Sequence, residues 1–246
     1  MTEKIGEVCL NLDCYDGEDL YSDGDVEEEL LDIVKHNSAD RFPALIRERA
    51  KWPILYHLSE QRENIIDWFP MKEGASVLEV GAGCGAVTGA LVRMASRVVA
   101  NDLSKRRSLI NAWRHRDAKN LELAVGNFNR VSEMLTEKFD YVTLIGVLEY
   151  APSYMAGEDP FGTFLEKING LLKPDGEILI AIENRLGMKY FAGCREDHVG
   201  RAFEGIEGYP GTDSVRTFSR AELERLFEEK GFREYEFYYP YPDYKF

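Results

Sequence analysis

The sequence of 246 residues contains no long apolar run and few cysteines. No stretch approaches the roughly 18 apolar residues that a membrane-spanning helix needs, and no apolar signal core follows Met1 to Lys4. Four cysteines, Cys9, Cys14, Cys84 and Cys194, form no CxxC pair, which argues against a disulfide framework and a zinc site. We therefore expect a cytoplasmic protein with reduced thiols and no membrane span.

Positive charge is also scarce, with 30 lysines and arginines against 44 aspartates and glutamates. Residues 1–32 hold twelve of the acids and only one base. The remainder is close to neutral and offers no positive field to a phosphate backbone. The best basic cluster, Lys105–Arg107 with Arg114–Arg116, fits a solvated helix face, so no nucleic-acid partner is predicted.

Only four histidines are present, and none is spaced with carboxylates as metal ligands usually are. Acids near Gly24 resemble a calcium loop, but the twelfth position of that register is Leu30, where a carboxylate is needed. No metal site is therefore predicted. Asp23 or Asp25 is expected instead to cap a helix over 26–36.

Residues 77–88 form the most informative stretch, an apolar strand followed by three alternating glycines. Gly81, Gly83 and Gly85 allow a sharp turn and a close approach to a ligand, with helix N-terminal amides directed at it. A second apparent strand, 97–102, ends in Asp102, which can accept both hydroxyls of a ribose. The two stretches together predict a nucleoside cofactor.

Glu79 indicates which cofactor this is, because Gly81, Gly83 and Ala86 also satisfy the dinucleotide pattern G-x-G-x-x-[GA]. A carboxylate two positions before the first glycine would repel a pyrophosphate. It would attract the ammonium and sulfonium groups of S-adenosylmethionine, whose own carboxylate can take the loop amides.

The chain at this point resembles the class I S-adenosylmethionine-dependent methyltransferases, whose first motif has an acid, one residue and then G-x-G-x-G. Three later stretches, 120–128, 139–150 and 171–182, resemble the family's following motifs in the right order. The resemblance implies an α/β fold: a Rossmann-like, mostly parallel sheet with helices on both faces. It also implies S-adenosylmethionine as the cofactor.

The resemblance further implies a set of cofactor-binding residues. Asn127 stands where the family usually has an aspartate that contacts the adenine amino group, and a neutral oxygen is a weaker acceptor there. The set is Glu79, Gly81, Ala82, Gly83, Gly85, Asp102, Leu103, Asn127, Phe128, Gly146 and Val147.

Composition and pattern divide the chain into three segments. Residues 1–39 form an acidic arm with a short helix, 40–73 a helical cap of the cofactor site, and 74–246 the core. The core is expected to contain strands at 76–80, 97–101, 121–125, 141–146, 177–183 and 232–239, with a turn at 174–176. A long glycine-rich and aromatic stretch at about 184–218 is expected to form a lid over the acceptor pocket.

Candidate catalytic residues follow from the chemistry, since a sulfonium leaves readily but a hydroxyl acceptor needs a base. His198 is the first candidate, since the unperturbed pKa of histidine suits proton removal near neutrality, and Asp197 or Glu196 could orient it. Glu149 and Tyr150 are the second choice. A packing role for His198, and a role of Glu149 and Tyr150 in shaping the site, stay open.

Residues 183–187 and 239–245 resemble methyltransferase modules of bacterial surface-glycan biosynthesis proteins, some of which are joined to glycosyltransferases. This resemblance implies methyl transfer to a small-molecule or glycan-linked acceptor, at oxygen, in polysaccharide biosynthesis. Ribosomal RNA adenine methylation is disfavoured because 146–152 has no Asn-Pro-Pro-Tyr-like motif. The alternative is a non-catalytic S-adenosylmethionine-binding module that scaffolds a glycan-assembly partner.

Overall fold

The computed structural model describes residues 1–19, 22–155, 157–241 and 243–245. The chain divides into two compact units, which we treat separately. The first unit comprises Met1–Thr143, Leu172–Ile178 and Pro240–Phe246. The second unit comprises Leu144–Leu171 and Leu179–Tyr239.

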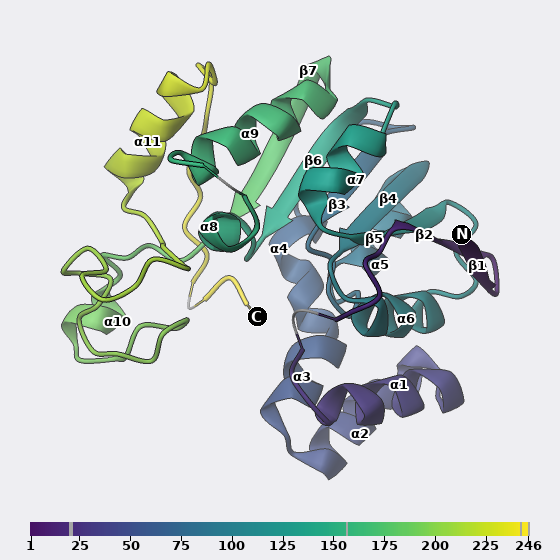
Figure 1. The fold of residues 1–246 in the computed structure, drawn as a ribbon. Coiled ribbons are helices and arrows are strands. Elements are labelled where there is room, and N and C mark those ends of the chain that lie inside the picture. Colours follow the sequence, from purple (N-terminus) through teal and green to yellow (C-terminus); the bar gives the residue numbers. More distant parts are fainter. Residues whose placement is uncertain (20–21, 156, 242, 246) are drawn as a thin grey trace. The chain divides into compact units, whose positions relative to one another are not determined.

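A seven-stranded sheet has the strand order β1-β2-β5-β4-β3-β6-β7 (Figure 1). The strands are β1 (Thr2–Ile5), β2 (Val8–Cys14), β3 (Ser76–Val80), β4 (Arg97–Asp102), β5 (Leu121–Gly126), β6 (Phe139–Ile145) and β7 (Leu172–Ala181). Strand β4 pairs in parallel with both β3 and β5, whereas β1 pairs antiparallel with β2. The predicted Rossmann-like, mostly parallel sheet is confirmed, with five of its strands close to their expected positions.

Strands β1 and β2 were not predicted, because the many acids of the N-terminal arm obscure the alternation of apolar and polar residues that marks a strand. Val8 and Leu10 are fully buried, while Cys9 between them is less so. Strand β2 lies parallel to β5, with Leu10 opposite Leu123. The acidic arm therefore extends the sheet at the edge beyond β5.

Two predictions for the second half of the chain are wrong. The expected turn at 174–176 lies inside β7, where Pro174 is tolerated because β7 is an edge strand. The expected strand at 232–239 does not form. Its alternating aromatic residues pack instead on Phe227, whose ring contacts those of Phe232, Tyr235 and Phe237.

The first unit also contains short helices, several of which are grouped together at the bottom of Figure 1. They are α1 (Val26–His36), α2 (Phe42–Arg49), α3 (Trp52–Leu58), α4 (Asn64–Asp67), α5 (Thr88–Met94), α6 (Lys105–Arg114) and α7 (Phe128–Met134), with the 3-10 turns η1 (Ala39–Arg41) and η2 (Glu60–Glu63). Leu30, Phe42, Ile54 and Ile110 share one apolar cluster with Cys84. Cys84 thus fills a buried position in the glycine loop.

The acidic arm neutralises the basic start of α6. Asp19 accepts hydrogen bonds from the backbone nitrogens of Lys105 and Arg106, and Glu27 pairs with Arg107 at 2.9 Å. The basic cluster is therefore partnered within the chain and is not the solvated face that we expected. Helix α1 has the predicted bounds, but the side chain of its N-cap, Asp25, makes no capping bond.

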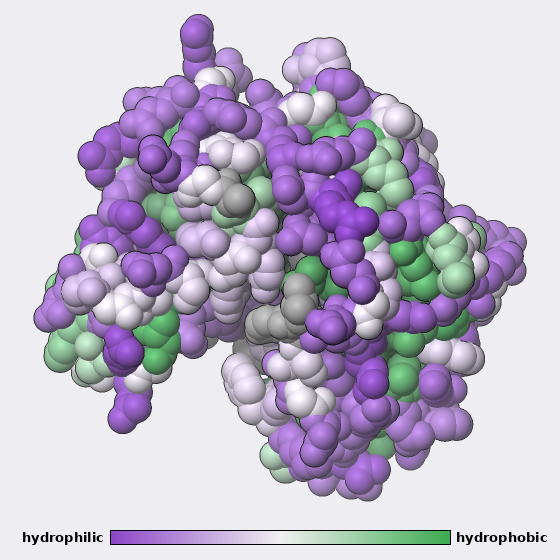
Figure 2. Space-filling view, in the orientation of Figure 1, coloured by the Kyte–Doolittle hydropathy of each residue, from purple (hydrophilic) through white to green (hydrophobic). Residues whose placement is uncertain are grey.

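The second unit contains η3 (Leu148–Tyr150) and the helices α8 (Ala151–Tyr154), α9 (Pro160–Leu171), α10 (Met188–Phe191) and α11 (Arg220–Glu229). Ser219 and Glu222 form a capping box at the start of α11. Hydrophilic side chains predominate on the face shown in Figure 2. Within the described parts of the chain, we find no helix with the length and apolar character needed to cross a membrane.

Candidate functional site

The glycine loop follows β3 and depends on backbone angles that favour glycine. The φ angles of Gly81, Gly83 and Gly85 are 72°, 53° and 79°. A Cβ atom at Gly85 would lie 2.4 Å from Oδ1 of Asn111, so a larger residue there would meet both backbone strain and a clash. Glycine at these positions therefore lets the loop approach a ligand more closely than larger residues would.

Asp102 ends β4 and touches the glycine loop, as the sequence predicted. Its Oδ2 accepts a hydrogen bond from the Gly83 nitrogen at 2.7 Å, and its Oδ1 accepts one from the Ser104 nitrogen at 2.9 Å. Burial raises the pKa of Asp102, and these two backbone hydrogen bonds oppose the rise. Each carboxylate oxygen retains acceptor capacity for a further donor, such as a ribose hydroxyl.

Glu79 lies within β3 and is buried. Its Oε2 accepts a hydrogen bond from the Thr88 hydroxyl, at the start of α5, at 2.6 Å. Burial raises the pKa of Glu79 to about 8, against the opposing effect of that hydrogen bond. The carboxyl group therefore carries a proton in most molecules at neutral pH, and it must lose that proton before it can attract a cation.

This raised pKa leads to a prediction for the Glu79→Gln variant. The pKa of Glu79 is higher in the folded state than in the unfolded chain. Its protonated carboxyl group therefore stabilises the fold fully at pH values below the unfolded-state pKa, and this stabilisation is lost as the pH rises towards 8. We expect the free energy of unfolding of the wild type, relative to Glu79→Gln, to fall between pH 5 and 8 by at most about 4 kcal/mol. Urea unfolding of both proteins across this range measures the difference. Parallel pH profiles would contradict the prediction.

Asn127 and Phe128 lie at the end of β5, beside Asp102 on β4. Asn127 Oδ1 accepts a hydrogen bond from the Asn129 nitrogen at 2.9 Å and so caps α7, while Phe128 is buried. Residues of the glycine loop, Asp102, Leu103, Asn127 and Phe128 therefore gather at the carboxyl ends of β3, β4 and β5. Gly146 and Val147 belong to the second unit, where the Gly146 nitrogen donates to the Ala181 oxygen at 2.8 Å. The cofactor contacts of all these residues stay predictions.

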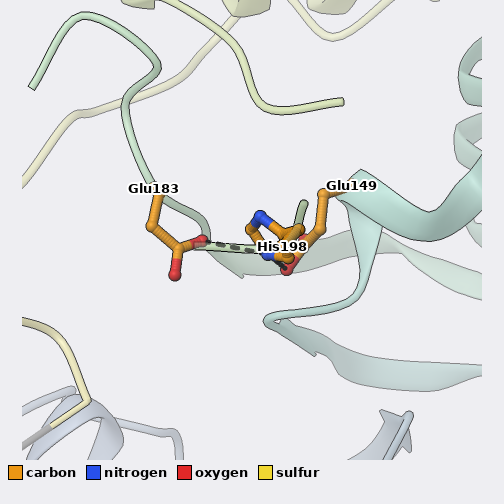
Figure 3. A group of neighbouring side chains, drawn as sticks. All are labelled: Glu149, Glu183 and His198. Atoms are coloured by element: carbon orange, nitrogen blue, oxygen red, sulfur yellow. Dashed lines mark ion pairs between the residues drawn. The ribbon is translucent and has the colours of Figure 1, made fainter. Parts of the chain in front are cut away.

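The second unit holds a cluster of three glutamates, Glu149, Glu183 and Glu196, around His198, which we call the acid–histidine cluster. Figure 3 shows Glu149, Glu183 and His198. His198 Nδ1 lies 2.8 Å from Glu196 Oε1, and its Nε2 lies 3.5 Å from Glu149 Oε1 and 3.7 Å from Glu183 Oε2. Glu149 comes from η3, Glu183 follows β7, and the other two follow α10. Every member except Glu183 was expected from the sequence to be a catalytic or orienting residue. Glu183 follows β7 much as Asp102 ends β4.

Glu196, and not Asp197, orients His198. Glu196 Oε2 accepts the backbone N–H groups of His198 and Val199 at 2.7 Å, and its Oε1 accepts the Tyr209 hydroxyl at 3.0 Å. Asp197 instead accepts the Tyr190 hydroxyl. The predicted lid segment is thus fastened around one buried carboxylate.

The charges of the cluster alter the expected chemistry of His198. Burial alone would lower its pKa, but the hydrogen bonds with Glu149 and Glu196 and the charge of Glu183 raise it to about 10. The expectation that His198 has a pKa suited to proton removal near neutrality is therefore wrong for the histidine in these surroundings. Burial raises the pKa of Glu149. The Tyr150 ring packs edge-on against the imidazole, with centroids 5.3 Å apart.

Three of these residues could also hold a metal ion. One ligand atom each from Glu149, Glu183 and His198 lies within 4.8 Å of the others. The sequence shows no metal-ligand spacing because the three residues come from separate segments of the chain. The prediction of no metal site stays untested.

Known proteins that resemble this chain share its fold, and the region of similarity includes the glycine loop. The Methyltransferase domain family matches residues 78–178. A curated relative is the ubiquinone biosynthesis O-methyltransferase of Pseudomonas fluorescens, 26% identical over 158 residues, which cover 62% of this chain and 65% of that protein. The match thus spans just under two thirds of the relative's length.

Two solved structures share the fold. One is a methyltransferase in complex with the Trm112 methyltransferase activator of Haloferax volcanii, with a TM-score of 0.50 and 23% identity, covering 79% of this chain and 76% of that chain. The other is the magnesium protoporphyrin IX methyltransferase of Synechocystis PCC 6803 with bound S-adenosylhomocysteine, with a TM-score of 0.51 and 14% identity, covering 78% and 87%. Residues 78–178 therefore resemble a methyltransferase domain, and the chain shares the Rossmann-like fold of the class I methyltransferases.

Proposed function

We propose that the protein transfers a methyl group from S-adenosylmethionine to a hydroxyl oxygen of a small-molecule or glycan-linked acceptor. The buried acid–histidine cluster is the observation that carries this proposal. Amines and thiolates need little help to attack a sulfonium, whereas a hydroxyl must lose its proton. The activity named for the curated relative, an O-methyltransferase, also supports oxygen as the acceptor atom.

In this proposal the first unit binds the cofactor. Asp102 accepts the ribose hydroxyls, Asn127 accepts from the adenine amino group, and the amides of the glycine loop hold the cofactor carboxylate. Glu79 compensates the positive charge of the ligand when ionised. Residues 40–73 cover the cofactor, and Gly146 and Val147 line the path of the methyl group.

The second unit supplies the groups that act on the acceptor. Glu149 receives the proton of the hydroxyl, His198 holds Glu149 in place through its Nε2 atom, and Tyr150 shapes the site through its ring contact with His198. Because the sulfonium is already a good leaving group, alignment of the acceptor and removal of its proton are the main demands on the protein. Residues 184–218, fastened through Glu196 and Tyr209, select the acceptor.

The surface-glycan resemblance of 183–187 and 239–245 supports a sugar acceptor and a glycosyltransferase partner in polysaccharide biosynthesis. Four free thiols fit a cytoplasmic setting for this step. The alternative of a non-catalytic scaffold has no specific observation in its favour.

The proposal is tested by incubating the protein with S-adenosylmethionine labelled in the methyl group and a pool of nucleotide sugars and surface-glycan extract. We expect label in a sugar product, with NMR placing the new methyl group on oxygen. Label on nitrogen or sulfur would refute the choice of atom. Cofactor binding by calorimetry without transfer to any acceptor would favour the scaffold.

A further inference from the structure

We infer that the acid–histidine cluster is a divalent-cation site, with Glu149, Glu183 and His198 as its ligands. Glu196 orients the histidine and does not coordinate the ion. Ion binding at this cluster requires neither cofactor nor acceptor, so the inference goes beyond methyl transfer.

The distances suit a metal ion. Two ligand atoms that each lie about 2.1 Å from an ion are about 3.0 Å apart at a right angle and about 3.4 Å apart in a tetrahedron. His198 Nε2 lies 3.5 Å from Glu149 Oε1 and 3.7 Å from Glu183 Oε2. All three ligand atoms lie within 4.8 Å of one another, so movement of the two glutamate side chains toward a common ion would complete the site.

The hydrogen bonding of His198 presents the correct nitrogen. An ionised carboxylate can only accept, so the contact with Glu196 at 2.8 Å places a proton on Nδ1. Nε2 is then the atom that faces Glu149 and Glu183 (Figure 3). A histidine that donates from one nitrogen to a carboxylate and binds metal through the other is the usual arrangement in metal sites.

A buried oxygen of Glu149 supplies the second, independent observation. The residue is 1% exposed, and its Oε2 has no hydrogen-bond partner among the described residues. In the part of the chain that the structure describes, no lysine or arginine forms a salt bridge with Glu149 or Glu196, so His198 is their common cationic partner. A buried carboxylate oxygen without a donor is costly, and a cation would remove that cost.

The ligand set indicates the kind of ion. Calcium and magnesium prefer oxygen ligands alone, whereas two carboxylates and one imidazole suit Mn²⁺ or Zn²⁺. Three protein ligands also leave positions open for water or another oxygen ligand. If the proposed function holds, an ion there would lower the pKa of a bound acceptor hydroxyl and assist its deprotonation.

The test is a titration of the full chain with MnCl₂, without cofactor or acceptor, followed by the EPR signal of free Mn²⁺. We expect one bound ion per chain. Glu149→Gln and His198→Gln should each weaken binding by more than about 100-fold, since loss of an outer partner alone costs 10- to 100-fold. Glu166→Gln, an exposed carboxylate of the same unit that pairs with Lys230, is the matched control and should bind as the wild type does.

Pulsed EPR of the wild-type complex avoids reliance on the folding of any variant. Nitrogen-14 modulation from a coordinated imidazole is expected on the bound Mn²⁺. An unchanged free-ion signal, an absence of nitrogen coupling, or full binding by folded Glu149→Gln would each overturn the inference. Because neither cofactor nor acceptor is present, such a failure leaves the proposed methyl transfer standing, and a failure of methyl transfer leaves the ion count unaffected.

Discussion

Methyl transfer by the Glu149→Gln variant is expected to fall by about 10²- to 10⁴-fold, the range usually lost with a group that moves the acceptor's proton. Glutamine has nearly the same shape but can neither take a proton nor compensate the charge of His198, whose Nε2 lies 3.5 Å away. Transfer of labelled methyl groups to the acceptor pool measures the loss. Binding of S-adenosylhomocysteine should stay within twofold, because we assign the cofactor contacts chiefly to the first unit.

Two further variants make this result specific. His198→Gln should lose transfer to a similar extent, whereas Glu166→Gln, which removes an exposed carboxylate from the same unit, should retain it. Thermal unfolding shows whether each variant is folded. If folded Glu149→Gln transfers methyl groups as fast as the wild type, the acid–histidine cluster has no part in the reaction.

Cofactor affinity should fall by about 10- to 100-fold in Asp102→Asn. A carboxylate can accept charge-assisted hydrogen bonds from both ribose hydroxyls, each worth about 1.5 to 3 kcal/mol, whereas an amide offers one neutral oxygen. Asp102 also accepts the backbone nitrogens of Gly83 and Ser104, so the glycine loop should loosen as well. Calorimetric titration with S-adenosylhomocysteine measures the change.

Asp117→Asn is the matched control, since it removes an exposed carboxylate from the same unit. It should bind S-adenosylhomocysteine as the wild type does. Asp102→Asn protein that is folded and binds within twofold of the wild type would show that the acid at the end of β4 does not hold the ribose. Tight binding of NAD by the wild type would go further and contradict our interpretation of Glu79.

The parts of the fold that could be predicted are those whose signals are local. Strands β3, β4 and β5 begin at the predicted residues because each is a short apolar run between polar turns. The turn expected at 174–176 and the strand expected at 232–239 failed for a different reason. Their outcome depends on an edge position in the sheet and on the packing of aromatic rings against Phe227, neither of which a local pattern encodes.

The candidate site likewise contains parts that local sequence signals predicted and parts that they did not. The sequence assigned the glycine loop and Asp102 to one ligand, and the structure brings Gly83 and Asp102 into contact because parallel strands bring their carboxyl ends to one edge of a sheet. Glu183 was missed, and the pKa of His198 was misjudged, because both depend on which carboxylates the fold gathers around one imidazole. No spacing rule links residues 149, 183 and 198.

The sequence by itself determined the methyltransferase fold and the class of cofactor, since a glycine loop and alternating strands are read from neighbouring residues. Only the tertiary structure decided that the acidic arm joins the sheet through β2 and neutralises α6, and that three glutamates surround His198. The physical reason is the range of the interactions. Backbone geometry and burial patterns act over a few residues, whereas charge pairing and pKa shifts depend on groups that only the folded chain brings together.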